Sequence, residues 1–172
     1  MPRIVFRGSR TVPQVKFRDG FQPRNARDEG IQIQPGGQMI GGVSTSKDLG
    51  SAVRYAGNYE GYAYAIYMVE GVDVLDYIID RANRWFGGGR WEGGIQNAVT
   101  QMEIAMPTVE TGSIIAARQC ERITKDDGKT VCRLVGKVHL NEHCNAPDDI
   151  QRQGRAWLSA EIEVSAEYED PA

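Results

Sequence analysis

The stretch Tyr62-Ala-Tyr-Ala-Ile-Tyr-Met-Val69 is the part of this sequence that most clearly predicts a β-strand. Its aromatic and β-branched residues are the types that fit the pleated, packed surface of a sheet. We therefore expect it to be a central strand, against which the rest of the chain is organised.

The segments before this strand predict short elements of both kinds. A helix is indicated where apolar residues recur at helical spacing and a glycine follows, and another where Ser46 or Asp48 is available as an N-cap. The expected elements are a strand at Arg3–Arg7, a helix over Val12–Phe21 ending at Gly20, a strand at Val43–Ser46 and a helix over Asp48–Tyr59.

The segments after it predict mostly strands. Lys125–Lys129 carries an Asp-Asp-Gly turn signal between two long apolar runs, and Ala160–Glu167 alternates apolar and polar residues as a half-buried strand does. The expected elements are a mixed segment becoming helical over Val72–Trp85, a glycine-rich and tryptophan-containing loop over Phe86–Ile95, a short strand at Gln101–Met106, and strands at Ser113–Ile123 and Thr130–Leu140. Strands outnumber helices and cluster late, so we expect an α+β fold with mostly antiparallel sheets, formed as one domain over residues 1–172.

The composition is that of an ordinary globular protein. Of the 172 residues, 41% are hydrophobic and 25% charged, which excludes a disordered chain or a fibre. The net charge of −3 provides no general basic field for a polyanion, so any nucleic-acid contact must be local. No apolar run has the length of a membrane span, and the first seven residues lack the apolar stretch of a signal peptide.

The cysteines and histidines do not form a recognisable metal motif. Cys120, Cys132 and Cys144 include no Cys-x-x-Cys pair, and His139 and His143 lie on a strand leading into a loop, so no metal site is expected. Cys120 and Cys132 flank the predicted hairpin turn. They are either joined by a disulfide or are buried free thiols, and the sequence leaves both alternatives open.

Three short polar motifs lie at the ends or starts of predicted strands. They are Arg7 in Phe6-Arg7-Gly8, the triplet Ser44-Thr45-Ser46, and Gln101-Met102-Glu103 before Ile104-Ala-Met-Pro107. Each motif alone is common and has a plain structural explanation. Their order and spacing together are the informative feature.

In that order they resemble the Arg–Ser-Thr-Ser–(Glu or Gln)-x-Glu class of mono-ADP-ribosyltransferases, which includes cholera, pertussis and C3-like toxins and the pierisin-like DNA-modifying enzymes. The resemblance extends over roughly residues 3 to 140, including the opening Arg7–Phe21, the strand Gly42–Ser46 and the tyrosine-rich strand that follows. The first strand departs from the family, which often has Tyr before the Arg and Asp two positions after it. Phe6 and Ser9 stand at those places here.

The resemblance implies two mostly antiparallel sheets forming an NAD-binding cleft, with short helices, and NAD as the substrate. Breaking the bond between nicotinamide and ribose builds positive charge on the sugar, which a carboxylate can stabilise. Glu103 is the candidate carboxylate, and the resemblance implies that Ser44 aims it. Arg7 would bind the phosphates or the residues that frame them. Gly8, Thr45 and Ser46 complete the implied NAD-binding residues.

The resemblance also implies a macromolecular acceptor for the ADP-ribose. Gln101 and Trp91 are the candidate acceptor-recognition residues, and Gln101 cannot deprotonate a guanidinium as a Glu would. We therefore expect a nucleic-acid base or a non-arginine protein side chain. The implied role is that of a toxin or effector, secreted or delivered into a target cell, with a delivery or immunity partner. An NAD glycohydrolase and a catalytically silent binding module on this fold are the alternatives.

Glycine is the one compositional outlier: 20 of the 172 residues are glycine, about 12%, against about 7% in average proteins. Gly41-Gly42 directly precedes the Ser-Thr-Ser strand, and Gly87–Gly94 leads to Gln101. We expect these glycines to form loops around the cleft, where the backbone approaches a ligand closely.

Overall fold

The computed structural model describes residues 3–24, 30–34, 39–84 and 92–167. Its helices and strands follow one another along the chain as β1 (Ile4–Ser9), α1 (Pro13–Asp19), β2 (Gln32–Ile33), β3 (Met39–Ile40), β4 (Val43–Ser46), α2 (Leu49–Asn58), β5 (Tyr62–Tyr67), β6 (Val72–Asp73), α3 (Val74–Arg84), α4 (Glu92–Gln101), β7 (Glu103–Met106), a 3₁₀ turn (Thr111–Ser113), β8 (Ile114–Thr124), β9 (Thr130–Leu140), α5 (Asp148–Ser159) and β10 (Glu163–Ser165).

Eight of the strands form one antiparallel sheet in the order β10-β9-β8-β5-β1-β4-β7-β6, and β2 and β3 form a separate ribbon. The sheet has two sections, because β1 pairs with β4 only at Phe6 and Ser46, whereas β1 pairs with β5 over six residues. The predicted α+β class and antiparallel strands are confirmed. The two expected sheets are these two sections, joined at a single pair of residues.

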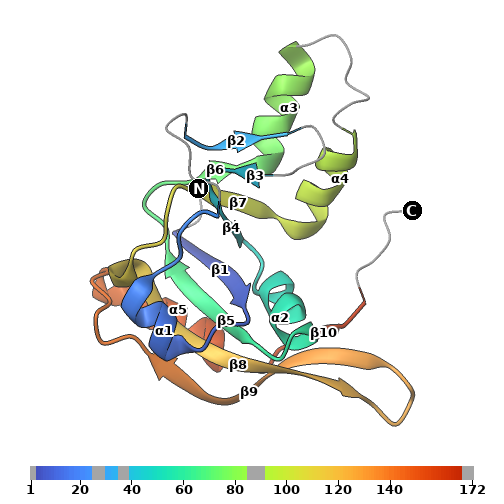
Figure 1. Cartoon of the computed structure of the whole chain (residues 1–172). Coiled ribbons are helices and arrows are strands. Elements are labelled where there is room, and N and C mark those ends of the chain that lie inside the picture. Colours follow the sequence, from blue (N-terminus) through green and yellow to red (C-terminus); the bar gives the residue numbers. More distant parts are fainter. Residues whose placement is uncertain (1–2, 25–29, 35–38, 85–91, 168–172) are drawn as a thin grey trace.

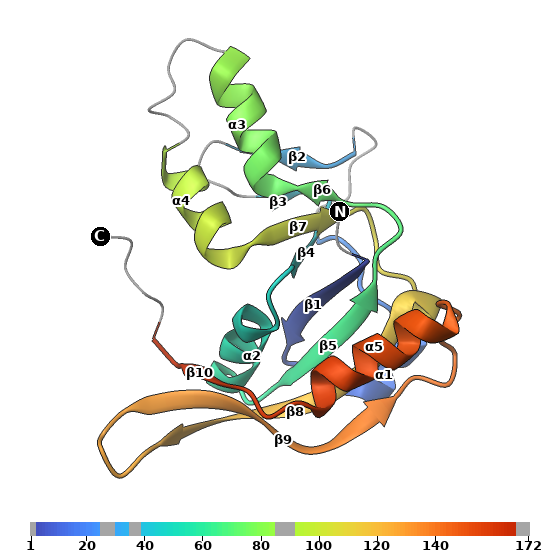
Figure 2. The ribbon, with the colours of Figure 1, turned by 180° about the vertical axis from the view of Figure 1, so that it is seen from behind.

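The strand predicted from Tyr62–Val69 is central, as expected. Tyr62–Tyr67 lies between β1 and β8, and Tyr64 and Ile66 are completely buried. Side chains alternate between the two faces of the sheet, so Val5 belongs to one hydrophobic cluster while Ile4 and Phe6 belong to another. Helices α2 and α5 pack on the face of Ile4 and Phe6, and α1 on the opposite face (Figures 1 and 2).

A third group of elements lies at one end of the molecule, away from the β8–β9 hairpin (Figure 1). It consists of α3, α4, the β2–β3 ribbon and the edge strands β6 and β7. Its apolar support is a smaller cluster, whose buried members are Ile33, Val74, Ile78, Ala98 and Ala105.

Most of the boundaries predicted before residue 75 agree with the structure. Helix α1 ends at Gly20, which has a φ of 68°, and the Asp48 carboxylate caps α2 by accepting from the backbone N–H groups of Gly50 and Ser51. The turn in the β8–β9 hairpin is confirmed as well, with Gly128 at a φ of 86°.

Two predictions need correction, and one helix was not predicted. Residues 92–95, expected in a loop, begin helix α4, and Gln101, expected in a strand, is the last residue of that helix. Helix α5 was not predicted at all, although Pro147, the acidic residues of its first turn and the spacing of Ile150, Gly154 and Leu158 are the signals that would have indicated it.

The cysteines are free thiols. Cys120 and Cys132 are buried, and Cys120 lies opposite Leu134 while Cys132 lies opposite Arg122, so they are not directly paired across the hairpin. Burial raises the pKa of Cys120 to about 12. These thiols therefore act as small apolar groups, the second of the two alternatives.

Arg118 connects the β8–β9 hairpin to helix α5. The register of the two strands shifts after Arg118, opposite Gly136, which has a φ of 69°. Arg118 Nε donates to the Gly136 carbonyl at 2.9 Å, and Nη1 donates to the Leu158 carbonyl at 2.9 Å and to the Ala160 carbonyl at 3.3 Å. One guanidinium thus donates hydrogen bonds both to a carbonyl at the strand irregularity and to carbonyls at the end of the helix.

Arg118→Ala is expected to lower the free energy of unfolding by about 2 kcal/mol, because these carbonyls lose a charged donor. Urea denaturation followed by circular dichroism measures this change. Arg122→Ala, at an exposed arginine on the same strand, is the control and should change stability by under about 0.5 kcal/mol. Equal losses in the two variants would contradict the role given to Arg118.

Candidate functional site

Strand β4 brings together the three polar motifs noted in the sequence. It lies between β1, which carries Arg7, and β7, which begins with Glu103. Ser46 pairs with Phe6 on one side and with Glu103 on the other. The motifs are far apart in sequence and lie side by side because the sheet order is β1-β4-β7.

Ser44 contacts both charged residues of this group. Its hydroxyl donates to Glu103 Oε1 at 2.6 Å, and its carbonyl accepts a 2.6 Å hydrogen bond from Arg7 Nη1. The next two residues bind the backbone of the neighbouring segment, with the Thr45 hydroxyl donating to the Ile104 carbonyl at 2.8 Å and the Ser46 hydroxyl to the Gln101 carbonyl at 2.6 Å. All four hydrogen bonds therefore fix β4 against its two neighbouring strands and the end of α4.

These residues line a cavity of about 560 Å³, a size suited to a substantial organic ligand. The described lining residues are Phe6, Arg7, Gly8, Gln22, Arg24, Met39, Gly41, Gly42, Val43, Ser44, Thr45, Ser46, Ser51, Ala52, Arg54, Tyr55, Thr100, Gln101 and Glu103. Among them, the charged side chains are three arginines and one glutamate. The cavity is thus locally basic in a chain with a net charge of −3.

The electrostatic state of Glu103 is a balance of opposing effects. Burial raises the pKa of this carboxyl, while the hydrogen bond from Ser44 and the charge of Arg7 lower it, and the net result is a raised pKa. Burial also lowers the pKa of the Arg7 guanidinium, which remains charged at any physiological pH because its ordinary value is so high.

Arg7 has donor capacity that the protein does not use. Among the described residues, its Nε is a buried side-chain nitrogen without a hydrogen-bond partner, and a buried unpaired donor costs free energy. The guanidinium also lies 5.3 Å from the centre of the Phe21 ring. An anionic or carbonyl oxygen in the cavity that Arg7 lines would suit this group.

Gly8 has a packing function at the edge of the cavity. A Cβ at this position would lie 2.6 Å from the Ala52 carbonyl oxygen and 2.9 Å from Tyr55 Cδ1. The absence of a side chain therefore allows α2 to approach β1 closely and places the Tyr55 ring beside Gly8. Gly41, just before β4, has a φ of 77°, so one of the two glycines noted there is needed for its backbone conformation.

Three residues on the cavity wall were not among those predicted from the sequence: Arg24, Arg54 and Tyr55. Tyr55 is three residues after Ala52 on α2, so both lie on the helix face turned toward Gly8. This spacing was available from the sequence. Arg24 follows α1 and nothing in its local sequence indicated the cavity.

The remaining candidates have different outcomes. Gln101 is exposed at the end of α4 and lines the cavity beside Glu103. Trp91 lies outside the described residues, as do Gly87–Gly89 of the glycine-rich segment. Over the residues that are described, no cluster of side chains suited to a metal ion occurs and no helix is long and apolar enough to cross a membrane.

No family model matches the sequence, and no curated protein matches it either. Solved structures do resemble the fold. The nicked form of CARDS toxin matches with a TM-score of 0.64 at 15% identity, covering 85% of this chain and 32% of that one. Scabin toxin from Streptomyces scabies in complex with NADH matches with a TM-score of 0.55 at 23% identity, covering 84% and 76%.

A third match is a guanine-specific ADP-ribosyltransferase, with a TM-score of 0.56 at 19% identity, covering 84% of this chain and 79% of that one. The chain therefore has the fold of ADP-ribosyltransferase toxins. It spans about a third of the length of CARDS toxin and about three quarters of scabin.

Removing the Ser44 hydroxyl is expected to raise the pKa of Glu103 further, because the hydrogen bond that favours the charged carboxylate is lost while burial remains. Carboxyl ¹³C NMR titration of Ser44→Ala measures this shift. Ser51→Ala is the matched control, since Ser51 also lines the cavity but its hydroxyl bonds to Asp48. A Glu103 pKa in Ser44→Ala equal to or below that of the unmodified protein would contradict the balance described above.

Proposed function

We propose that this chain is a mono-ADP-ribosyltransferase that uses NAD as its substrate and acts as a toxin domain. The observation that carries the proposal is the linked group Arg7–Ser44–Glu103, which lines a cavity in the fold of ADP-ribosyltransferase toxins. The NADH bound in the scabin structure supports a dinucleotide as the occupant of the cavity.

The residues of the cavity suit the parts of NAD. Arg7, with Arg24 and Arg54 on the wall, supplies positive charge for the two phosphates. Tyr55 offers an aromatic ring beside Gly8, which suits a flat heterocycle. The hydroxyls of Thr45 and Ser46 already donate to backbone carbonyls next to β4, so these two residues contribute by maintaining the cavity wall.

Glu103 performs the central step in this proposal. Ser44 occupies Oε1 and leaves Oε2 for a ribose hydroxyl. The bond between the ribose C1′ and the nicotinamide nitrogen breaks, its electron pair leaves with nicotinamide, and the carboxylate stabilises the positive charge that develops on the sugar. A nucleophile on the acceptor then bonds to C1′ and loses its proton.

The acceptor we propose is a nucleic-acid base, with guanine as the first candidate. The guanine-specific enzyme among the structural matches supports a base. Gln101 supports it too, because a neutral amide that both donates and accepts hydrogen bonds matches the edge of a base, and it cannot act as the base that an arginine acceptor requires. A non-arginine protein side chain is the alternative acceptor, and a transfer assay that offers DNA, RNA and protein separately distinguishes the two.

Glu103→Gln is expected to reduce nicotinamide release from NAD by at least about 10²-fold, because the amide keeps the shape and the Ser44 bond but lacks the negative charge. High-performance liquid chromatography of nicotinamide measures the rate. At neutral pH this variant should also be at least as stable as the parent, since a raised pKa means that the buried charged form costs stability above that pKa. Undiminished NAD cleavage by Glu103→Gln would sink the proposal.

Gln101→Ala is expected to reduce ADP-ribose transfer about tenfold or more, because the proposal assigns the Gln101 side chain to the acceptor. NAD cleavage without acceptor should change by under about threefold, because the contact of Gln101 with Ser46 is made through its backbone carbonyl. Transfer is measured with labelled NAD and, separately, guanine-containing DNA, guanine-free DNA, RNA and cell-extract protein. Labelling of protein alone would replace the base by a protein acceptor, and NAD cleavage without any labelled acceptor would indicate a glycohydrolase.

A further inference from the structure

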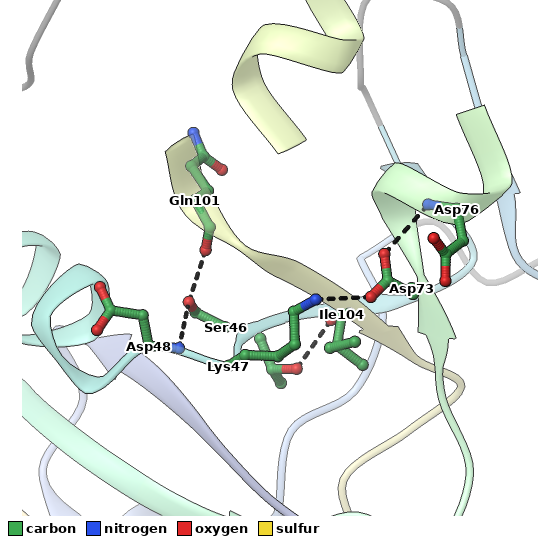
Figure 3. A network of polar contacts seen from close by, with 8 residues as sticks. Ser46, Lys47, Asp48, Asp73, Asp76, Gln101 and Ile104 are labelled. Atoms are coloured by element: carbon green, nitrogen blue, oxygen red, sulfur yellow. Dashed lines mark hydrogen bonds and ion pairs between the residues drawn. The ribbon is translucent and has the colours of Figure 1, made fainter. Parts of the chain in front are cut away.

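Gln101 ends α4 just before β7, which begins with Glu103, and this α4–β7 junction is held by the residues that follow Thr45. The Ser46 hydroxyl donates to the Gln101 carbonyl at 2.6 Å (Figure 3). The Lys47 backbone N–H donates to the Met102 carbonyl at 2.9 Å. The same Ser46 hydroxyl accepts from the Asp48 N–H at 3.0 Å. The end of α4 is thus attached to the segment between β4 and α2.

The junction has an uncommon backbone conformation. Met102 has a φ of 48°, in the left-handed region that non-glycine residues seldom adopt, and its N–H still donates to the Ala98 carbonyl at 2.9 Å. Met102 therefore ends the helix and turns the chain directly into β7. The bonds to the Gln101 and Met102 carbonyls hold both sides of this turn in place.

The Lys47 side chain reaches Asp73, the last residue of β6, directly before α3. Its Nζ lies 2.7 Å from Asp73 Oδ2 (Figure 3). Both side chains are mostly buried, with exposures of 28% for Lys47 and 12% for Asp73. Asp73 Oδ1 accepts from the Asp76 N–H at 3.1 Å, at the first turn of α3. Burial would raise the pKa of Asp73, but the Lys47 ammonium and the backbone N–H groups of Leu75 and Asp76 lower it overall.

Lys47 therefore connects three parts of the protein: the strand with Ser44, the start of α3 and the end of α4. The two helices pack on each other, and their apolar support is the small third cluster. Thr100 and Gln101, at the end of α4, form the part of the cavity wall beside Glu103. Lys47 and Asp73 do not themselves belong to the described lining of the cavity.

We propose that the Lys47–Asp73 ion pair is a positioning device that fixes the α3–α4 unit against the cavity and so determines how efficiently ADP-ribose reaches the acceptor rather than water. NAD cleavage needs Arg7, Ser44 and Glu103, which are held by the sheet. Transfer also needs Gln101 in register with Glu103, which depends on where α4 ends. This inference rests on the proposed function.

The test compares four variants: Lys47→Met, Lys47→Arg, Asp73→Asn and the double variant Lys47→Met with Asp73→Asn. Asn at position 73 keeps an oxygen for the Asp76 N–H but loses the charge, and Met keeps the apolar stem of Lys47. Two rates are measured, nicotinamide release without acceptor and ADP-ribose transfer to a guanine-containing oligonucleotide. Hydrogen–deuterium exchange of the peptide containing residues 92–101 reports on α4 directly.

We expect Lys47→Met and Asp73→Asn each to reduce transfer about tenfold, less than the roughly 100-fold that a misplacement of 1 Å can cost, with NAD cleavage within about twofold of the parent. The double variant should be no worse than either single variant, because the two residues act as one pair. Lys47→Arg, which keeps the positive charge, should retain the transfer activity of the parent. Exchange in α4 should be faster in Lys47→Met than in the parent.

Transfer and cleavage that fall in parallel would overturn the inference, as would transfer by Lys47→Met within twofold of the parent. These results differ from a failure of the proposed function, in which the parent protein releases no nicotinamide from NAD. In that case, unchanged exchange of α4 in Lys47→Met would show independently that the ion pair does not fix the helix, and faster exchange would support the positioning role.

Discussion

The hydrogen bond from Ser44 to Glu103 is the interaction on which the rest of the site depends. It opposes the effect of burial on the Glu103 carboxyl and directs one carboxylate oxygen, leaving the other for a ligand. The carbonyl of the same residue holds Arg7. A single residue on a short strand thus sets the positions of the positive and the negative group of the cavity, at atoms that the sheet keeps nearly fixed.

The sheet is joined at this point by a single residue pair, and the two sections that meet there have different apolar support. The β1–β5 section is supported by two large hydrophobic clusters, whereas the section with β6 and β7 carries a smaller third cluster with α3 and α4. The sections meet at the Phe6–Ser46 pair, and the cavity opens beside it. A substrate bound there would contact both sections. The polar bonds of Ser46 and Lys47 therefore help to hold the smaller section in position, as apolar packing does in the larger one.

The sequence predicts correctly the elements that carry a strong local signal. Tyr62–Tyr67 was identified by composition, α2 by its Asp48 cap, and the β8–β9 turn by its Asp-Asp-Gly signal. The prediction failed where glycine obscured a helix, at α4, and where a helix lacked a run of large apolar residues, at α5. In both helices tertiary packing outweighs weak local propensity, since Ala98 and Leu158 are buried against the rest of the fold.

The sequence by itself determined the residue types of the site, because Arg, Ser-Thr-Ser and Gln-x-Glu are chemical groups that can be read directly, and it placed them near strand ends through periodicity and turn signals. Only the tertiary structure decided that Ser44 bonds to Glu103 and that Lys47 reaches Asp73, since these contacts join residues 59 and 26 positions apart. It also decided that Tyr55 lies beside Gly8. The reason is physical: such contacts follow from the order and register of strands, which non-local packing selects and no short stretch of sequence encodes.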